Sequence, residues 1–199
     1  MLLQVEDLRV SFATDQGRAQ AVDGVSFSIS AGETLGIVGE SGCGKSSLAR
    51  AVVQLLPRTA GAVTFLGRNM VPSEKEVLRR ARQDLQIVFQ DPLASLDPRM
   101  TLGASVAEPL LAFAPHLSRA EREARVKEMM TQVGLDPDLI NRYPHELSGG
   151  QNQRVGVARA MVLKPKLVVC DEAVSALDVS IQAQILKLLA DLQREFHTS

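Results

Sequence analysis

The chain has 199 residues, of which 45% are apolar, and its 22 Lys and Arg residues nearly balance its 23 Asp and Glu residues, so the net charge is −1. This length and composition are enough for one well-packed domain or a small pair, which excludes an intrinsically disordered protein. The near-neutral charge provides no basic face of the kind that duplex-binding proteins use, so no nucleic acid partner is expected.

The sequence also lacks a membrane span, a secretory signal and a cysteine motif for disulfides or zinc. No stretch approaches the roughly 18 consecutive apolar residues of a membrane span, and the N-terminus lacks the basic patch and apolar run of a secretory signal. We therefore expect a soluble, cytoplasmic chain. Cys43 and Cys170 have neither CxxC spacing nor neighbouring histidines. This indicates reduced, packed thiols rather than a disulfide framework or a zinc site.

The first 90 residues alternate between strand patterns and one helix pattern. Apolar and polar positions alternate at the start of the chain, and shorter apolar runs follow. A polar loop at 13–20 joins the first two predicted strands. We expect strands at residues 3–12, 22–29, 34–38, 63–65 and 85–89, and a helix at 46–56 that ends before Pro57.

Helical patterns dominate between Asp91 and Arg159, where β-branched runs disappear. Residues 120–133, for example, carry i,i+4 pairs of opposite charge. This part is interpreted as a helical insert. Residues 166–170 then have the continuous apolar pattern of a buried parallel strand, and 180–196 are predicted to form an amphipathic helix. Strands that alternate with helices indicate an α/β core.

A phosphate-binding motif lies between the predicted strand at 34–38 and the helix that follows. Residues 39–46 read GESGCGKS and match GxxxxGK[ST] in the strand-to-helix context that the motif requires. Glycines let backbone N–H groups face a phosphate, Lys45 supplies a positive charge, and the Ser46 hydroxyl can ligate Mg²⁺. The helix N-terminus adds partial positive charge. The alternative is an ordinary glycine-rich turn.

Two further motifs place polar residues at the end of a predicted strand and at the start of a predicted helix. Asp171 and Glu172 follow the apolar run at 167–170, and a strand that ends in acids places them where α/β sheets bind ligands. Asp171 is suited to hold Mg²⁺ and Glu172 to orient an attacking water; the alternative is a strand capped by solvated acids. LSGGQ at 147–151 places Ser148 and two glycines at a helix start. This helix start is interpreted as a second anion site, and the alternative is a simple N-cap.

These motifs together resemble the ATP-binding subunit of an ABC transporter over essentially the whole chain. The residues that carry the resemblance are GESGCGKSS at 39–47, VFQD at 88–91, LSGGQ at 147–151, VVCDE at 168–172 and SALD at 175–178. FQDPLASLDPRMT at 89–101, YPHELSGGQ at 143–151 and DEAVSALDVSIQAQIL at 171–186 are similar to the ATPases of oligopeptide, dipeptide and nickel importers.

The resemblance implies an α/β fold with a P-loop NTPase core of ABC type. An N-terminal antiparallel β subdomain and the core would occupy 1–90 and 160–199, and a helical subdomain 91–159. It further implies ATP and Mg²⁺ as cofactors, with Glu172 and Gln90 in catalysis and Ser46, Gln90 and Asp171 around the metal. The implied nucleotide-binding residues are Phe12, Gly39, Glu40, Ser41, Gly42, Cys43, Gly44, Lys45, Ser46, Ser47, Ser148, Gly149, Gly150, Gln151 and Asp178.

Several of these roles depend on a second subunit. In the family, a signature similar to LSGGQ contacts the γ-phosphate of ATP held by the partner, and Asp178 lies in the loop that crosses the interface. Phe12 takes the place of the aromatic that stacks on adenine, with a core aromatic as the alternative. The resemblance thus implies a head-to-tail dimer, identical or mixed, and a transmembrane permease on the inner face of the cell membrane.

Two features depart from the family pattern. Asn152 stands where a long polar or basic side chain is more frequent. The strand and histidine that family members carry beyond the acid pair are not found before Ser199, and His197 is not assigned that role; the C-terminal strands are thus expected to be missing, as in a truncated chain. The main hypothesis is an ATPase subunit of an importer for peptides or nickel-like solutes. The alternatives are a module that binds ATP without hydrolysing it and a non-transport ABC ATPase.

Overall fold

The computed structural model describes residues 1–15, 17–71, 73–172 and 178–199, and their contacts form two compact units. Unit 1 is Met1–Leu85 with Ser199, and unit 2 is Gln86–Thr198. The expected division into a core at 1–90 and 160–199 and a helical subdomain at 91–159 stays a prediction. The elements are β1 Leu3–Thr14, β2 Gly17–Ile29, α1 Lys45–Val52, β3 Ala60–Phe65, β4 Arg68–Asn69, α2 Lys75–Asp84, β5 Leu85–Val88, α3 Pro92–Ser95, α4 Leu102–Phe113, α5 Arg119–Gln132, η1 Pro137–Asn141, η2 Pro144–Glu146, α6 Gly149–Met161, β6 Leu167–Cys170 and α7 Val179–Phe196.

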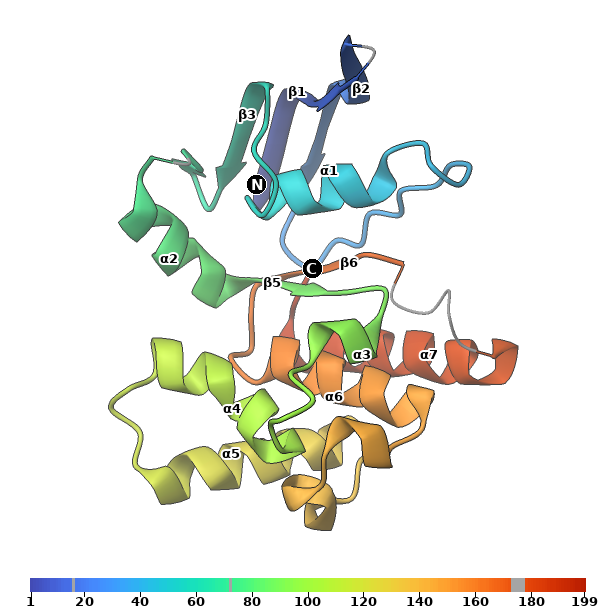
Figure 1. The fold of residues 1–199 in the computed structure, drawn as a ribbon. Helices are drawn as coiled ribbons and strands as arrows, with labels where there is room; N and C mark the ends of the chain where they lie inside the picture. The colour runs from blue at the N-terminus through green and yellow to red at the C-terminus, as the bar shows by residue number, and fades with distance from the viewer. Residues whose placement is uncertain (16, 72, 173–177) are drawn as a thin grey trace. The chain divides into compact units, whose positions relative to one another are not determined.

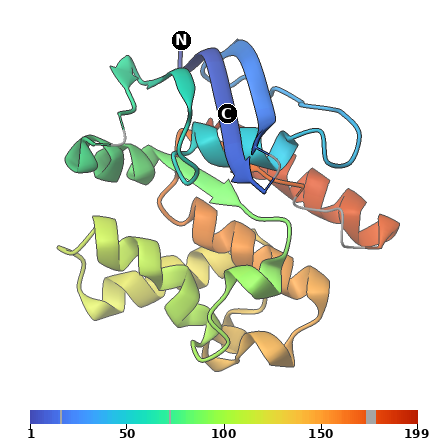
Figure 2. The ribbon, with the colours of Figure 1, turned by 45° about the horizontal axis from the view of Figure 1, so that its top comes forward.

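Unit 1 is built on an antiparallel sheet in the strand order β2-β1-β3-β4. Leu3 of β1 pairs with Ile29 of β2 on one side and with Phe65 of β3 on the other. All three side chains are buried, as the period-2 pattern predicts for a sheet with one covered face. Helix α1 contacts β1 and β2 and supplies buried apolar residues, and both views show it against this sheet (Figure 1, Figure 2).

Two expectations for unit 1 are wrong. Residues 13–20 are not a loop, because β1 runs on to Thr14 and β2 already begins at Gly17. The Thr14 hydroxyl donates to the Gly17 carbonyl at 2.9 Å, and Gly17 has a φ of 118°, which a glycine adopts without strain. The predicted strand at 34–38 is absent: the described sheets do not include it, and Val38 is 92% exposed. A strand needs ladder hydrogen bonds with a neighbour, which its own apolar pattern does not supply.

Unit 2 is organised around α6. This helix contacts α3, α4, α5 and α7, which Figure 1 shows in green to red around it. Val106 of α4, Met130 of α5 and Val155 of α6 are completely buried in the resulting core. Strands β5 and β6 are hydrogen-bonded neighbours. The predicted helices at 120–133 and 180–196 are confirmed as α5 and α7, and the strands at 85–89 and 166–170 as β5 and β6.

Sheet and helices together form the α/β architecture that the sequence predicts. Helix α5 shows why the local signals succeed: the Ser118 hydroxyl accepts from the Glu121 N–H at 3.2 Å, and the Glu121 carboxylate accepts from the Ser118 N–H at 2.7 Å. This capping box satisfies two N–H groups at the helix start. No helix in the described ranges is long and apolar enough to cross a membrane.

Candidate nucleotide-binding site

The predicted phosphate loop lies in unit 1 and leads directly into α1. The Lys45 ammonium donates to the carbonyl oxygens of Gly39, at 3.0 Å, and Glu40, at 2.8 Å. The loop is therefore folded round this positive charge. Gly42 and Gly44 have φ values of 80° and 98°, in the left-handed region that favours glycine. A turn of this kind, closed round a cation at a helix N-terminus, has the chemistry of a phosphate site.

Gly44 is required for a second reason, which is space. A Cβ atom at Gly44 would lie 2.1 Å from the carbonyl oxygen of Ala21 in β2. The beginning of α1 is thus packed directly on the backbone of the sheet. The contact with Ala21 has no signature in the sequence, because it depends on how the loop returns to the strand.

Phe12 lies on the hairpin formed by β1 and β2, which also carries Ala21. It pairs with Ala19 of β2, two residues from Ala21, which corresponds to about 7 Å along a strand. Its side chain is 40% exposed, so the alternative of a core aromatic is wrong. The part of the hairpin that carries Phe12 therefore lies beside the start of α1, with the ring accessible to a ligand.

The acid pair and Gln90 belong to unit 2, where two strand ends meet. The Asp171 N–H, just after β6, donates to the Val88 carbonyl at the end of β5 at 2.9 Å. Gln90 follows Val88 by two residues, so both polar residues come from neighbouring strand ends. Asp171 is only 3% exposed. Glu172 has a φ of 47°, a left-handed value that five other non-glycine residues of the described ranges share.

Ser148 is the N-cap of α6, as the signature motif predicts. Its hydroxyl accepts from the Gln151 N–H at 3.3 Å, and the Gln151 side chain accepts from the Ser148 N–H at 2.9 Å. Within the described part of the chain, the N–H groups of Gly149 and Gly150 donate no hydrogen bond, as is usual in a first helical turn. These N–H groups are the donors that α6 offers to an anion.

The signature glycines also have a packing role. A Cβ atom at Gly150 would lie 2.9 Å from Cγ2 of Ile181 in α7, so a larger residue would push α7 away. Asp178 precedes α7 as its N-cap residue, and its carbonyl accepts from the N–H groups of Ile181 and Gln182. Residues 173–177, with the first three residues of the SALD motif, lie outside the described residues.

Known proteins share the sequence and the fold of this chain. Residues 22–175 match the family model described as ABC transporter. The chain belongs to the ABC transporter family. It is 54% identical, over 208 residues, to the oligopeptide transport ATP-binding protein OppF of Salmonella typhimurium. That match covers 100% of this chain and 62% of the relative.

Two other members of the ABC family extend this comparison. The di/tripeptide transport ATP-binding protein DppF of Pseudomonas aeruginosa is 52% identical over 192 residues, which cover 96% of this chain and 59% of DppF. Among solved structures, the dimeric ATP-binding cassette MJ0796 bound to ADP and Pi matches with a TM-score of 0.88 and 29% identity. That match covers 98% of this chain and 84% of the cassette. The chain thus spans about three fifths of the curated relatives.

The structure shows a buried residue beside the ABC signature motif whose burial the sequence does not reveal. Asn152, noted only as a departure from the family pattern, is 1% exposed, and its amide points back at the segment before α6. Nothing in its sequence context signals this burial. Both cysteines are free, as expected for reduced thiols. Cys43 is exposed, so the expectation of a packed thiol is wrong there, whereas burial raises the pKa of the Cys170 thiol to about 11.

No group of three or more His, Cys, Asp or Glu side chains within the described ranges gathers as a metal site. Mg²⁺ in nucleotide enzymes, however, is commonly held by one or two carboxylates together with substrate phosphates. The residues expected round Mg²⁺ are divided between the units, with Ser46 in unit 1 and Gln90 and Asp171 in unit 2. They provide hydroxyl, amide and carboxylate oxygens, the ligand types that this cation prefers.

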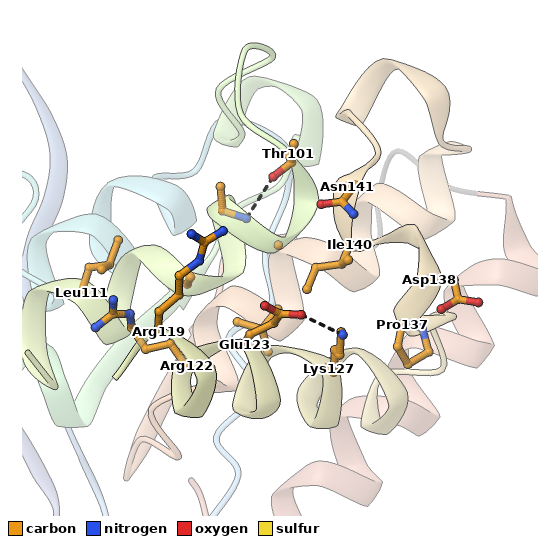
Figure 3. A pocket seen from close by; sticks show the side chains of 14 residues that line it. Thr101, Leu111, Arg119, Arg122, Glu123, Lys127, Pro137, Asp138, Ile140 and Asn141 are labelled. Atoms are coloured by element: carbon orange, nitrogen blue, oxygen red, sulfur yellow. Dashed lines mark hydrogen bonds and ion pairs between the residues drawn. The ribbon is translucent and has the colours of Figure 1, made fainter. Parts of the chain in front are cut away.

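A separate pocket of about 600 Å³ lies in unit 2 between α4, α5 and η1 (Figure 3). Thr101, Arg119, Lys127 and Ile140 are among the residues that line it, and Glu123 pairs with Lys127 at 2.8 Å on its wall. None of the predicted site residues lines this pocket. It is distinct from the phosphate loop and from the signature.

Proposed function

We propose that this chain is the ATP-binding part of an ATPase subunit that energises a peptide importer. The observation that carries the proposal is the loop of residues 39–46, folded round Lys45 and entering α1 through left-handed Gly44. The names of the relatives OppF and DppF, at 54% and 52% identity, support peptides as the transported class.

The phosphate loop and Phe12 bind the nucleotide. Backbone N–H groups of the loop and of the α1 N-terminus donate to oxygens of the β- and γ-phosphates, and Lys45 exchanges its loop carbonyls for phosphate oxygens. The exposed ring of Phe12, on the hairpin beside α1, stacks on the adenine. Ser46, Gln90 and Asp171 would hold Mg²⁺, which neutralises charge on the phosphates when bound.

Glu172 and Gln90 serve the hydrolytic step. Glu172 orients and polarises a water molecule for attack on the γ-phosphorus, with Gln90 beside it. A new bond forms from the water oxygen to phosphorus, the bond from the γ-phosphorus to the β,γ-bridging oxygen breaks, and the proton of the water passes by way of the Glu172 carboxylate to the phosphate that leaves with ADP.

The signature acts on the nucleotide of a second subunit, which is a second copy of this chain or a related ATPase. The open N–H groups of Gly149 and Gly150 at the start of α6 suit the γ-phosphate of that ATP. Asp178 lies at the same head-to-tail interface. The match to a cassette solved as a dimer supports this arrangement. With a transmembrane permease as the other partner, the subunit works in the cytoplasm at the inner face of the membrane.

Calorimetry with Mg-ATP tests the nucleotide site. Lys45→Ala removes a charge-assisted contact that contributes about 1.5–3 kcal/mol, so affinity is expected to fall roughly tenfold to a hundredfold. Lys187→Ala is the control, because Lys187 lies outside the phosphate loop and forms an exposed ion pair with Asp191 at 3.0 Å. Equal affinities for the Lys45→Ala variant and the unchanged chain would contradict the assignment.

Transport is tested with the subunit and its co-expressed permease. We expect ATP-dependent uptake of labelled peptides into vesicles, and loss of that uptake with Glu172→Gln. ATP hydrolysis without any peptide uptake would favour a non-transport ABC ATPase. ATP binding without hydrolysis above the Glu172→Gln level would favour the binding-only module.

A further inference from the structure

The turn before the signature is stabilised by the carboxylate of one of its own residues, Glu146. The Glu146 carboxylate accepts from the Tyr143 N–H at 2.7 Å and, with its other oxygen, from the Arg142 guanidinium at 2.7 Å. These two bonds lower the pKa of Glu146 below its usual value, so the carboxylate is ionised at neutral pH. The Arg142 carbonyl in turn accepts from the Leu102 N–H, at the start of α4, at 2.8 Å.

Asn152 holds the same turn from the other side. Its Nδ2 donates to the carbonyl oxygen of Pro144 at 2.9 Å and to that of Leu147 at 3.4 Å. The side chain is 1% exposed, so it reaches back from α6 over the helix start rather than into solvent. The buried Nδ2 group contributes through these bonds, because its desolvation would otherwise be uncompensated, whereas Oδ1 of Asn152 is buried without a hydrogen-bond partner among the described residues.

Asn152 and Glu146 together fix the backbone at Leu147 and just before it, next to Ser148. Leu147 is bound by Asn152, Glu146 fixes the turn one residue earlier, and Ser148 follows at once as the N-cap of α6. Neither Asn152 nor Glu146 belongs to the first-turn donors of α6. They restrict the path of the backbone that carries Ser148, Gly149 and Gly150.

Resting on the proposed function, we propose that Asn152 and Glu146 are positioning residues that aim the start of α6 at the ATP of a second subunit. Asn152 acts through the carbonyls of Pro144 and Leu147, and Glu146 acts through the Tyr143 N–H. Preorganised donors stabilise an anion because they need no rearrangement when it arrives. Loosening the turn should therefore weaken ATP-dependent dimerisation and leave ATP binding by the monomer unchanged.

Asn152→Asp is the sharpest substitution. It keeps the shape of the side chain but replaces the Nδ2 donor with an oxygen, which repels the carbonyl oxygens of Pro144 and Leu147. Asn152→Ala is the second variant, because it removes the donor without adding charge. Glu121→Ala is the control for loss of a helix cap elsewhere in unit 2, since Glu121 closes the capping box of α5, away from the signature.

All variants are made in a chain that also carries Glu172→Gln, so that bound ATP persists. Sedimentation velocity with Mg-ATP gives the dimer dissociation constant, and calorimetry at low protein concentration gives the ATP affinity of the monomer. We expect Asn152→Asp to raise the dimer dissociation constant at least about tenfold, which corresponds to 1.4 kcal/mol. Asn152→Ala should shift it in the same direction, and Glu121→Ala should not.

The possible results distinguish a failure of the positioning role from a failure of the proposed function. A parent chain that binds ATP but associates neither with itself nor with the related ATPase expressed with its permease overturns the proposed arrangement in trans. An Asn152→Asp variant with the dissociation constant of the parent overturns the positioning role alone. Equal weakening by Glu121→Ala also overturns it, because general loss of stability would then explain the effect. Weakening confined to the Asn152 variants, with monomer affinity retained, supports the inference.

Discussion

Substituting Gly44 and Gly42 separately tests how the phosphate loop is built. Both residues have left-handed φ values, 98° and 80°. They differ in space, because a Cβ atom at Gly44 would lie 2.1 Å from the Ala21 carbonyl oxygen, whereas one at Gly42 meets nothing within 4 Å. Gly42→Ala therefore measures backbone strain alone, and Gly44→Ala measures strain together with the clash against β2.

The magnitudes follow from these two contributions. A non-glycine residue in the left-handed region costs roughly 1–2 kcal/mol, and overpacking against atoms that cannot move aside costs about 1–3 kcal/mol. Gly42→Ala should thus destabilise the fold by about 1–2 kcal/mol and Gly44→Ala by about 2–5 kcal/mol. The atom in the way is a backbone oxygen, so a change of side-chain rotamer does not relieve the contact.

The assay is urea unfolding of the nucleotide-free chain, followed by circular dichroism. Gly36→Ala serves as the reference for an unstrained glycine, because its Cβ position is open, and we expect little change from it. Equal losses of stability for Gly44→Ala and Gly42→Ala would refute the packing of the α1 start against β2.

Three further predictions concern unit 2. Gly103→Ala should destabilise the chain by about 1–3 kcal/mol in urea unfolding, because its Cβ would lie 2.3 Å from Cγ1 of Ile140; an unchanged midpoint would contradict the packing of α4 on η1. Ser118→Ala should cost about 1 kcal/mol through loss of the α5 cap, and Ser118→Asp should retain most of the stability. Glu146 has a lowered pKa in the folded chain, so its ionised form stabilises the fold above the pKa of the unfolded chain, and this contribution is lost as the pH falls through the folded pKa. Glu146→Gln, which mimics the protonated acid, should lower the thermal midpoint at neutral pH and approach the unchanged chain in acid; a difference that persists in acid would count against the ion pair.

Elements with strong local signals could be predicted from the sequence. The alternating residues of β1 and the i,i+4 charge pairs of α5 specify their structures through neighbours in the chain, and both elements are confirmed. The run at 34–38 fails for the opposite reason. Its residues have strand character, but a strand also requires a partner, and pairing is a property of the whole fold.

The same division applies to the candidate site. Glycines and Lys45 at fixed spacing predict a phosphate loop because the chemistry is local to the motif. Asn152 could be recognised only as a departure, since its bonds to Pro144 and Leu147 depend on how the turn folds back over α6. Likewise, the packing reasons for Gly44 and Gly150 involve Ala21 and Ile181, which are distant in the sequence.

Complementation between two defective variants tests the central claim, a nucleotide site shared by two subunits. Lys45→Ala impairs the phosphate loop and keeps the signature, whereas Ser148→Arg keeps the phosphate loop and places a cation at the start of α6, where it opposes the helix dipole. We predict that neither variant alone associates with Mg-ATP in sedimentation velocity, and that a mixture does, through one intact composite site. A mixture that stays monomeric under conditions in which the unchanged chain associates would contradict the account.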